Sequence, residues 1–226
     1  PGLVAFHRGR VQFEWRDYIE ALERFEEALT SDSSAVPRAD LFYYMAVSHI
    51  HIQEYPEARP HLDRWGETGE RRATMFYYRG LCDIGEEKFE SALAELRACE
   101  EAGPLPEEMG NVLFYTGYCL KQLERCGEAI PLLERAAELD PAGIEALNLL
   151  GFCYYKTARH AEAVACFERA VQIDPRSAID YANLARNLGE LGRTAEAIEN
   201  YRRALALDPH IGFARDQLRK LGEEPE

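Results

Sequence analysis

The chain has 226 residues, of which 46% are hydrophobic and 29% are charged, a balance typical of a protein with a buried core and not of a disordered tail. Its net charge of −14, with no offsetting Lys/Arg cluster, argues against a nucleic-acid partner, because a polyanion would be repelled. No apolar run approaches the roughly 20 residues that span a bilayer and no signal peptide is visible. We therefore expect no membrane insertion and a cytoplasmic location.

Small residues recur along the chain at steps of 34 or 37 residues. Six alanines each follow a Gly or Ala by twelve residues, and these are Ala21, Ala58, Ala92, Ala129, Ala163 and Ala197. Asp-Pro steps at Asp140, Asp174 and Asp208 keep the 34-residue spacing. A fixed period of this length indicates a repeat protein. We predict six repeats, at about 2–35, 39–72, 73–106, 110–143, 144–177 and 178–211.

Each repeat is predicted to form two helices, and places are counted below from the first residue of a repeat. At about 100° per residue, places four, seven, eight and eleven share one face of the first helix. Gly or Ala at the eighth place should face Ala at the twentieth, so that the two helix backbones approach closely. A larger side chain there would cost about 1–3 kcal/mol. Asp-Pro should end the second helix, because Pro lacks an N–H group and disfavours helix at the residue before it.

A last amphipathic stretch at about 211–222 follows the sixth repeat. Leu218 and Leu221 are spaced to share one helical face, so we predict a capping helix over the apolar side of the last repeat. Cys82, Cys119 and Cys153 all occupy the tenth place of their repeats. We therefore expect the six cysteines to be reduced, small hydrophobic residues of the core.

The spacing resembles the tetratricopeptide repeat, a family with a defined set of bulky, small and aromatic places. The fifth repeat matches that set throughout, with Leu147, Leu150, Gly151, Tyr154, Ala163, Phe167, Ala170 and Pro175. The resemblance covers nearly the whole chain. It implies an all-α fold, an α-solenoid in which antiparallel helix pairs stack into a right-handed superhelix with the first helices on the inner surface. It also implies one domain over residues 1–226.

A second apolar face is predicted on the first helices, at places two, five, six, nine, twelve and thirteen. In the array that the resemblance implies, these places line a groove, and a large apolar patch of this kind usually marks a partner site. The predicted partner-binding residues are Tyr43, Tyr44, Val47, Tyr77, Tyr78, Leu81, Phe114, Tyr115, Tyr118, Asn148, Phe152, Asn183 and Arg186. Ordinary packing between adjacent first helices is the alternative for part of this set. The family's carboxylate-binding set of Lys, Asn and Arg is absent, which argues against a chaperone-tail adaptor.

Catalytic and cofactor signatures are missing from the sequence. There is no Gly-rich phosphate loop, no His-Glu-x-x-His zinc motif and no nucleophile–base pair, so we predict no enzyme, no cofactor and no metal. The predicted function is a scaffold or adaptor that binds a peptide or protein segment in its aromatic-lined groove. Two alternatives remain open. One is a self-assembling scaffold that pairs through the groove or the end around Leu3, Val4 and Phe6, and the other is a regulatory segment of a larger multidomain protein.

Overall fold

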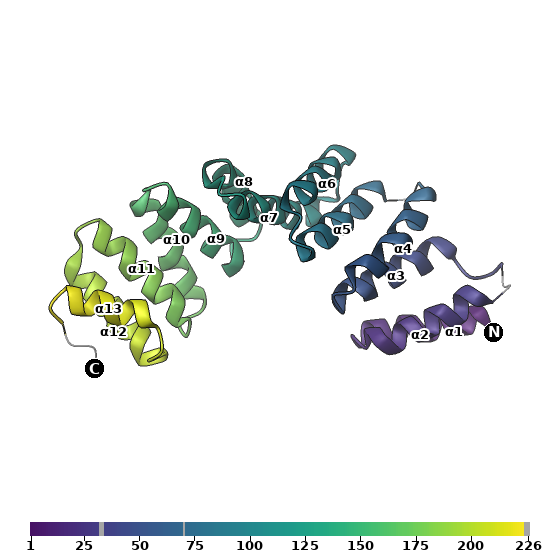
Figure 1. Ribbon diagram of the computed structural model, residues 1–226, viewed down its shortest axis with the longest axis horizontal. Helices are drawn as coiled ribbons and strands as arrows, with labels where there is room; N and C mark the ends of the chain where they lie inside the picture. Colours follow the sequence, from purple (N-terminus) through teal and green to yellow (C-terminus); the bar gives the residue numbers. More distant parts are fainter. Residues whose placement is uncertain (32–33, 70, 224–226) are drawn as a thin grey trace. The chain divides into compact units, whose positions relative to one another are not determined.

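The computed structural model describes residues 1–31, 34–69 and 71–223, and these form thirteen α-helices without a strand (Figure 1). In chain order the helices are α1 (Gly2–Glu14), α2 (Tyr18–Thr30), α3 (Arg38–His51), α4 (Tyr55–Glu67), α5 (Arg72–Gly85), α6 (Phe89–Ala102), α7 (Pro106–Gln122), α8 (Cys126–Leu139), α9 (Ile144–Lys156), α10 (His160–Ile173), α11 (Ala178–Glu190), α12 (Thr194–Leu207) and α13 (Gly212–Lys220). The most extensive contacts join the first and second helices of a repeat, as in α5 with α6 and α11 with α12. The predicted all-α fold of helix pairs is confirmed.

The chain divides into two compact units, which we call the N-terminal half (Pro1–Val112) and the C-terminal half (Leu113–Glu226). The division falls inside α7. Each half is described by itself below. The expectation that residues 1–226 form one continuous domain stays a prediction.

The close approach of paired helices depends on the glycine at the eighth place. A Cβ atom built on Gly151 would lie 2.8 Å from two ring carbons of Phe167, and one on Gly117 would lie 2.6 Å from Leu133. Phe167 and Leu133 occupy place twenty-four and are buried. In the third repeat a Cβ on Gly80 would also lie 3.6 Å from the backbone oxygen of Ala92 at place twenty, so the predicted close approach is present there, and the side chain at place twenty-four fills the space beside it.

A left-handed residue ends the first helix of every repeat. Positive φ values occur at place fifteen in all six, at Arg16, Gln53, Glu87, Glu124, Ala158 and Gly192. The next backbone N–H then donates to the carbonyl five residues back, as Arg159 does to Tyr154 at 2.9 Å. This is the Schellman arrangement, which satisfies carbonyl groups that the helix end leaves without partners. It turns the chain sharply into the second helix.

The predicted Asp-Pro stops are confirmed. Helices α8, α10 and α12 end at the residue before each Asp. The Oδ1 atom of each Asp accepts a hydrogen bond from the backbone N–H two residues later, at 3.2 Å from Ala142, 2.9 Å from Arg176 and 2.9 Å from His210. This local bond holds the turn that the helix cannot continue through.

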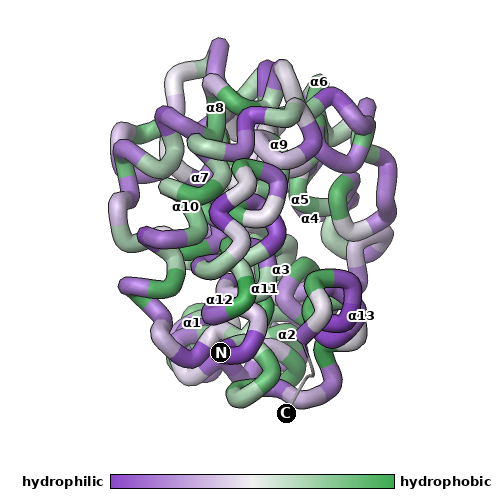
Figure 2. The backbone as a smooth tube through the Cα atoms, turned by 90° about the vertical axis from the view of Figure 1, so that its left-hand side faces the viewer, coloured by the Kyte–Doolittle hydropathy of each residue, from purple (hydrophilic) through white to green (hydrophobic). Residues whose placement is uncertain are grey.

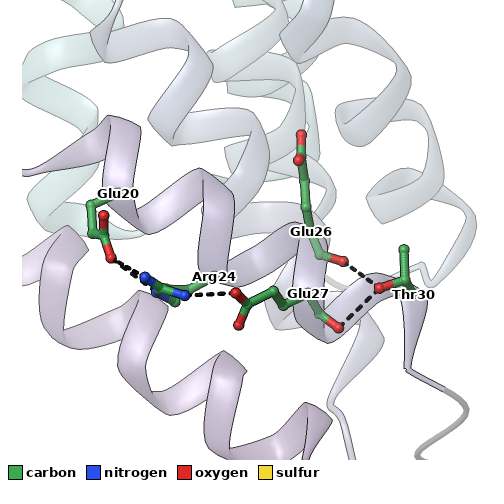
Figure 3. Close-up of polar contacts among 5 residues, drawn as sticks. All are labelled: Glu20, Arg24, Glu26, Glu27 and Thr30. Carbon is green, nitrogen blue, oxygen red and sulfur yellow. Dashed lines mark hydrogen bonds and ion pairs between the residues drawn. The ribbon is translucent and has the colours of Figure 1, made fainter.

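The exposed surface of α2 carries ion pairs and a side-chain hydrogen bond. On α2, Arg24 pairs with Glu20 at 2.5 Å and with Glu27 at 2.6 Å, and the Thr30 hydroxyl donates to the backbone carbonyl of Glu26 at 3.0 Å (Figure 3). Hydrophobic and hydrophilic residues alternate within the helices (Figure 2). Among the described residues, no helix is long and apolar enough to cross a membrane.

The predicted capping helix is present as α13, which packs against α12. Ala214 and Leu218 of α13 are fully buried, but Leu221 is 40% exposed. The expectation that Leu218 and Leu221 share one buried face is therefore wrong, because α13 ends at Lys220 and Leu221 lies beyond its last turn.

All six cysteines are buried free thiols, as expected. Burial raises the pKa of Cys82 and Cys153 to about 12, and that of Cys99 and Cys166 to about 11. Because the thiolate is the reactive form, these thiols are chemically quiet parts of the core.

Candidate partner-binding faces

We call the surface at places two, five, six, nine, twelve and thirteen the first-helix face of each half. Of the thirteen residues predicted there, eleven are half-buried and Phe152 is 36% exposed. Val47 is only 3% exposed, so its assignment to an accessible face is wrong. Both neighbouring first helices, α1 and α5, contact α3, and this short side chain is covered.

In the N-terminal half, the tyrosines of α3 and α5 contact one another. The Tyr43 and Tyr78 hydroxyl oxygens lie 3.4 Å apart and the two ring centroids 5.9 Å apart. Tyr43 also lies 5.0 Å from the Trp65 ring, and Tyr78 lies 5.3 Å from the Tyr77 ring. Burial, and then the neighbouring Tyr43, raises the pKa of Tyr78. The hydroxyl groups of this pair are therefore largely committed to each other.

Tyr44 contributes mainly to packing between α1, α2 and α3. Its ring centroid lies 5.0 Å from Phe13, 6.2 Å from Phe6 and 5.7 Å from Phe25. The Arg10 guanidinium lies 5.5 Å from the same ring. Part of the predicted face is thus consumed by the fold, as the packing alternative anticipates.

The C-terminal half has a different first-helix face. On α7 the Phe114 and Tyr115 rings lie 5.1 Å apart, and burial followed by the Glu145 charge raises the pKa of Tyr115. The Tyr118 hydroxyl accepts a hydrogen bond from the Gln122 amide at 2.9 Å, and Lys121 donates to the Gln122 oxygen at 3.0 Å. Polar side chains accompany the rings on this face.

Two lysine amino groups lie near the Phe152 ring on α9. The amino group of Lys121 lies 5.1 Å from its ring centroid and that of Lys156 lies 6.0 Å away. Such distances allow cation–π attraction, which is worth about 0.5–1 kcal/mol at exposed sites. Phe152 is also the most exposed residue of the predicted set, and two ammonium groups lie near its ring.

Arg186 on α11 lines a pocket of about 470 Å³. Its guanidinium carbon lies 4.3 Å from the Phe213 ring of α13 and 5.4 Å from the Tyr155 ring of α9. The pocket is lined by Tyr155, Arg186, Gly189, Glu190, Tyr201, Gln217 and Leu221. Burial raises the pKa of Tyr201 to about 12, so its hydroxyl stays protonated at neutral pH.

The predicted asparagines lie beside these groups. Asn148, one turn before Phe152 on α9, has a buried Oδ1 atom that accepts no hydrogen bond from the described residues. Asn183 is half-buried, and its backbone carbonyl accepts from the Asn187 amide at 2.9 Å. Asn148 thus offers an acceptor for which the fold supplies no donor.

Several pocket residues were missing from the predicted site. Tyr155 stands at place twelve of the fifth repeat and could have been added from the repeat register. Phe213, Gln217 and Leu221 come from α13 and its end, which lie outside that register. Among residues 1–31, 34–69 and 71–223, no group of three or more His, Cys, Asp or Glu side chains is arranged to hold a metal.

Comparison with known proteins places these faces in a family context. Residues 144–209 match the tetratricopeptide repeat family, and no curated protein matches the chain. The solved structure of YrrB, described as a tetratricopeptide protein with an unusual peptide-binding site, is similar at 23% identity over 86% of this chain and 97% of that one, with a TM-score of 0.73. The C-terminal part of a repeat protein from Cytophaga hutchinsonii is similar at 17% identity over 95% of this chain and 84% of that one, with a TM-score of 0.73.

MamA from Desulfovibrio magneticus RS-1 is also similar, at 17% identity over 79% of this chain and 99% of that one, with a TM-score of 0.69. At these identities the structural likeness speaks for the fold. The thirteen described helices fit six repeats and a capping helix. Residues 144–209 therefore carry tetratricopeptide repeats by direct match, and the other described helices share the fold of these similar repeat structures.

Proposed function

We propose that this chain is a scaffold that binds a peptide or protein segment on its first-helix faces, foremost on that of the C-terminal half. The observation that supports it best is the exposed Phe152 ring, which lies near the amino groups of Lys121 and Lys156. The C-terminal half that carries this ring also contains the Arg186 pocket. The tetratricopeptide fold supports a protein-interaction scaffold in general. A peptide-binding site in the similar YrrB structure is consistent with the proposal.

The physical argument rests on what each side chain does for the fold. Tyr44 packs against three other aromatic rings, so truncating it would disturb the core. Phe152 is instead 36% exposed, and two lysine amino groups lie 5.1 and 6.0 Å from its ring centroid. A partly exposed aromatic ring is suited to anchor a partner, because large rings carry much of the energy of protein interfaces.

Substitution of this ring tests the proposal. We expect Phe152→Ala to reduce capture of partner proteins from a lysate about tenfold or more. The free energy of unfolding should fall by about 1–2 kcal/mol, because most of the Phe152 surface is covered in the fold, and the variant should remain folded. Affinity capture with mass spectrometry and urea unfolding provide the two measurements.

Leu139→Ala is the matched control, since Leu139 is an exposed apolar residue at the end of the second helix α8. It should leave capture unchanged. If Phe152→Ala and Leu139→Ala retain the same partners equally well, the first-helix face of the C-terminal half is not the binding surface.

Self-association is the alternative with its own observation. Val4 and Val11 on α1 are 55% and 48% exposed, and Trp15, which follows the end of α1, is 74% exposed. They line a pocket of about 630 Å³ together with residues of α2. Phe6, which was expected to be available there, is 1% exposed and belongs to the core. A sedimentation coefficient that does not change with concentration would remove this alternative.

A further inference from the structure

We propose that the first-helix face of the C-terminal half binds an acidic segment of its partner, with carboxylates at Lys121, Lys156 and Arg186. The inference rests on the proposed function and specifies the chemistry of the bound segment. It follows from three observations on this half: which cations lack carboxylate partners, how the acidic and basic residues are distributed, and which buried polar atom lacks a donor.

Five of the eleven other lysines and arginines in the described part of the C-terminal half form ion pairs within the fold. Arg125 pairs with Glu128 at 2.6 Å, Arg159 with Glu162 at 2.8 Å and Arg193 with Glu196 at 2.5 Å. Each of these arginines stands near the start of a second helix and pairs with a glutamate three residues later. The positive charges of these arginines are therefore balanced by carboxylates of the helix that follows each of them.

The three cations of the first-helix face lie together with aromatic rings on one face. Within the part of the chain that the structure describes, Lys121, Lys156 and Arg186 form no ion pair, and each amino or guanidinium group lies against an aromatic ring. A ring attracts a cation but does not neutralise it. These three positive charges are thus available to carboxylates from outside.

This face has a net positive charge, whereas the whole chain has a net negative charge. The face carries three cations against Glu145 and Glu190, whereas the first-helix face of the N-terminal half carries Arg10 against Glu14 and Asp40. The whole chain has a net charge of −14. A net positive face on an acidic protein favours a partner of the opposite sign, both for attraction and for orientation.

Arg186 supplies the strongest recognition element. Its planar guanidinium presents several N–H donors in a fork that matches a carboxylate, and the rings of Phe213 and Tyr155 hold it beside a pocket of about 470 Å³. Gln217 on the same pocket offers an amide donor. Glu190, also on the pocket, would repel a carboxylate placed next to it, so the acidic group should approach from the side of Arg186.

Asn148 adds a point of contact for the backbone of the segment. Its buried Oδ1 atom lacks a donor among the described residues, and a buried acceptor without a partner is costly. Because this atom is covered, a backbone N–H of an extended peptide passing over Phe152 would reach it only after the Asn148 side chain rotates outward. Side-chain carboxylates and one backbone group would then be recognised together.

Peptides that differ only in charge test the inference. A fluorescein-labelled peptide of Glu-Phe-Glu-Gly repeated twice would be titrated with the chain and followed by fluorescence anisotropy, beside versions with Gln or Lys in place of Glu. We expect the Glu peptide to bind about tenfold more tightly than the Gln peptide, and the Lys peptide to bind least. Added salt should weaken only the Glu peptide, because screening acts on exposed charges.

Charge reversal on the protein completes the test. Lys121→Glu with Lys156→Glu should abolish the preference for Glu over Gln, while Arg135→Glu with Arg176→Glu changes the net charge equally on exposed residues outside the face and should preserve it. Arg186→Gln, checked by its melting temperature because Arg186 packs on α13, should weaken the Glu peptide about tenfold.

The outcomes separate this inference from the function beneath it. Equal binding of the Glu and Gln peptides, or lysate capture that is unaffected by Lys121→Glu with Lys156→Glu, would overturn the acidic partner. If capture still depends on Phe152 in that case, the scaffold function stands. Capture that depends neither on Phe152 nor on the lysines would remove both.

Discussion

The first-helix faces of the two halves occupy the same places of the repeat but use their polar groups differently. In the N-terminal half, Tyr43 and Tyr78 meet hydroxyl to hydroxyl. In the C-terminal half, Lys121 and Lys156 lie near an exposed Phe152 and form no ion pair among the described residues. The polar groups of the N-terminal face therefore contact each other, whereas the C-terminal face leaves two amino groups and an aromatic ring available to a partner.

The two halves also differ in the contacts that hold their interiors together. The N-terminal half uses a buried ionic link, in which Arg59 of α4 pairs at 2.5 Å with Asp83 of α5, a residue only 3% exposed. The fifth and sixth repeats, in the C-terminal half, match the family places closely and pack through Gly151 and Ala185. The C-terminal half also buries Asp180 and Asn187, but among the described residues neither forms an ion pair.

The largest expected effect follows from breaking the buried link. Arg59→Ala would leave the Asp83 carboxylate buried without its cation, a change that costs about 3–5 kcal/mol. We expect the low end of that range, because the Ser91 hydroxyl still donates to Asp83 at 2.7 Å. Urea unfolding measures the loss.

Arg125→Ala in the C-terminal half is the comparison for this prediction. Its partner Glu128 is exposed, and exposed pairs contribute only about 0–1 kcal/mol. Similar losses for Arg59→Ala and Arg125→Ala would show that the two halves do not differ in the way they use ion pairs.

A medium effect is expected at the helix crossings. Ala in place of Gly gains up to about 1 kcal/mol of helix propensity. At Gly151 the new Cβ would meet the Phe167 ring at 2.8 Å, whereas at Gly80 of the N-terminal half it would meet Leu96 at 3.0 Å. We expect Gly151→Ala to destabilise by about 1–2 kcal/mol and Gly80→Ala to be nearly neutral, as measured by thermal unfolding.

Gly127 calibrates this pair. It lies in α8, and nothing stands within 4 Å of a Cβ built on it. Gly127→Ala should therefore report the propensity gain alone. If Gly151→Ala is as stable as Gly127→Ala, the tight crossing in the fifth repeat relaxes without cost.

The smallest effect concerns a feature that the halves share, the left-handed residue at place fifteen. A residue with a Cβ pays roughly 1 kcal/mol to adopt this conformation and Gly does not. Glu87→Gly in the N-terminal half and Ala158→Gly in the C-terminal half should each stabilise by up to about 1 kcal/mol. Gly192→Ala should lose a similar amount of stability, because Gly192 has a positive φ that Ala disfavours. No neighbouring atom of the described residues lies within 4 Å of the new Cβ, so the loss should come from the backbone conformation alone. Differential scanning calorimetry can rank the three, and opposite signs for Glu87→Gly and Ala158→Gly would contradict a shared turn.

Much of the fold could be predicted from residue spacing, because Gly, Ala and Asp-Pro leave direct marks in the sequence. The helix pairs and the stops after Leu139, Ile173 and Leu207 followed from those marks. The left-handed turns did not, because only Gly192 among the six has the residue type that signals them.

The site was predictable only in outline. Helical periodicity assigns Val47 and Phe152 to the same face, but their burial depends on how neighbouring first helices cover them, and one is 3% exposed while the other is 36% exposed. The α13 contribution to the Arg186 pocket has no repeat register from which to infer it. Tertiary contacts therefore decide which places of the face remain accessible.

The buried thiols have a practical consequence for studying these faces. Since all six native cysteines are buried and burial raises the pKa of four of them, a thiol added by Leu139→Cys would be the fastest to react with a maleimide dye at neutral pH. A fluorophore or a surface tether could be attached at one defined point without deleting any native cysteine. Ligand screening on an otherwise unaltered chain would then be possible.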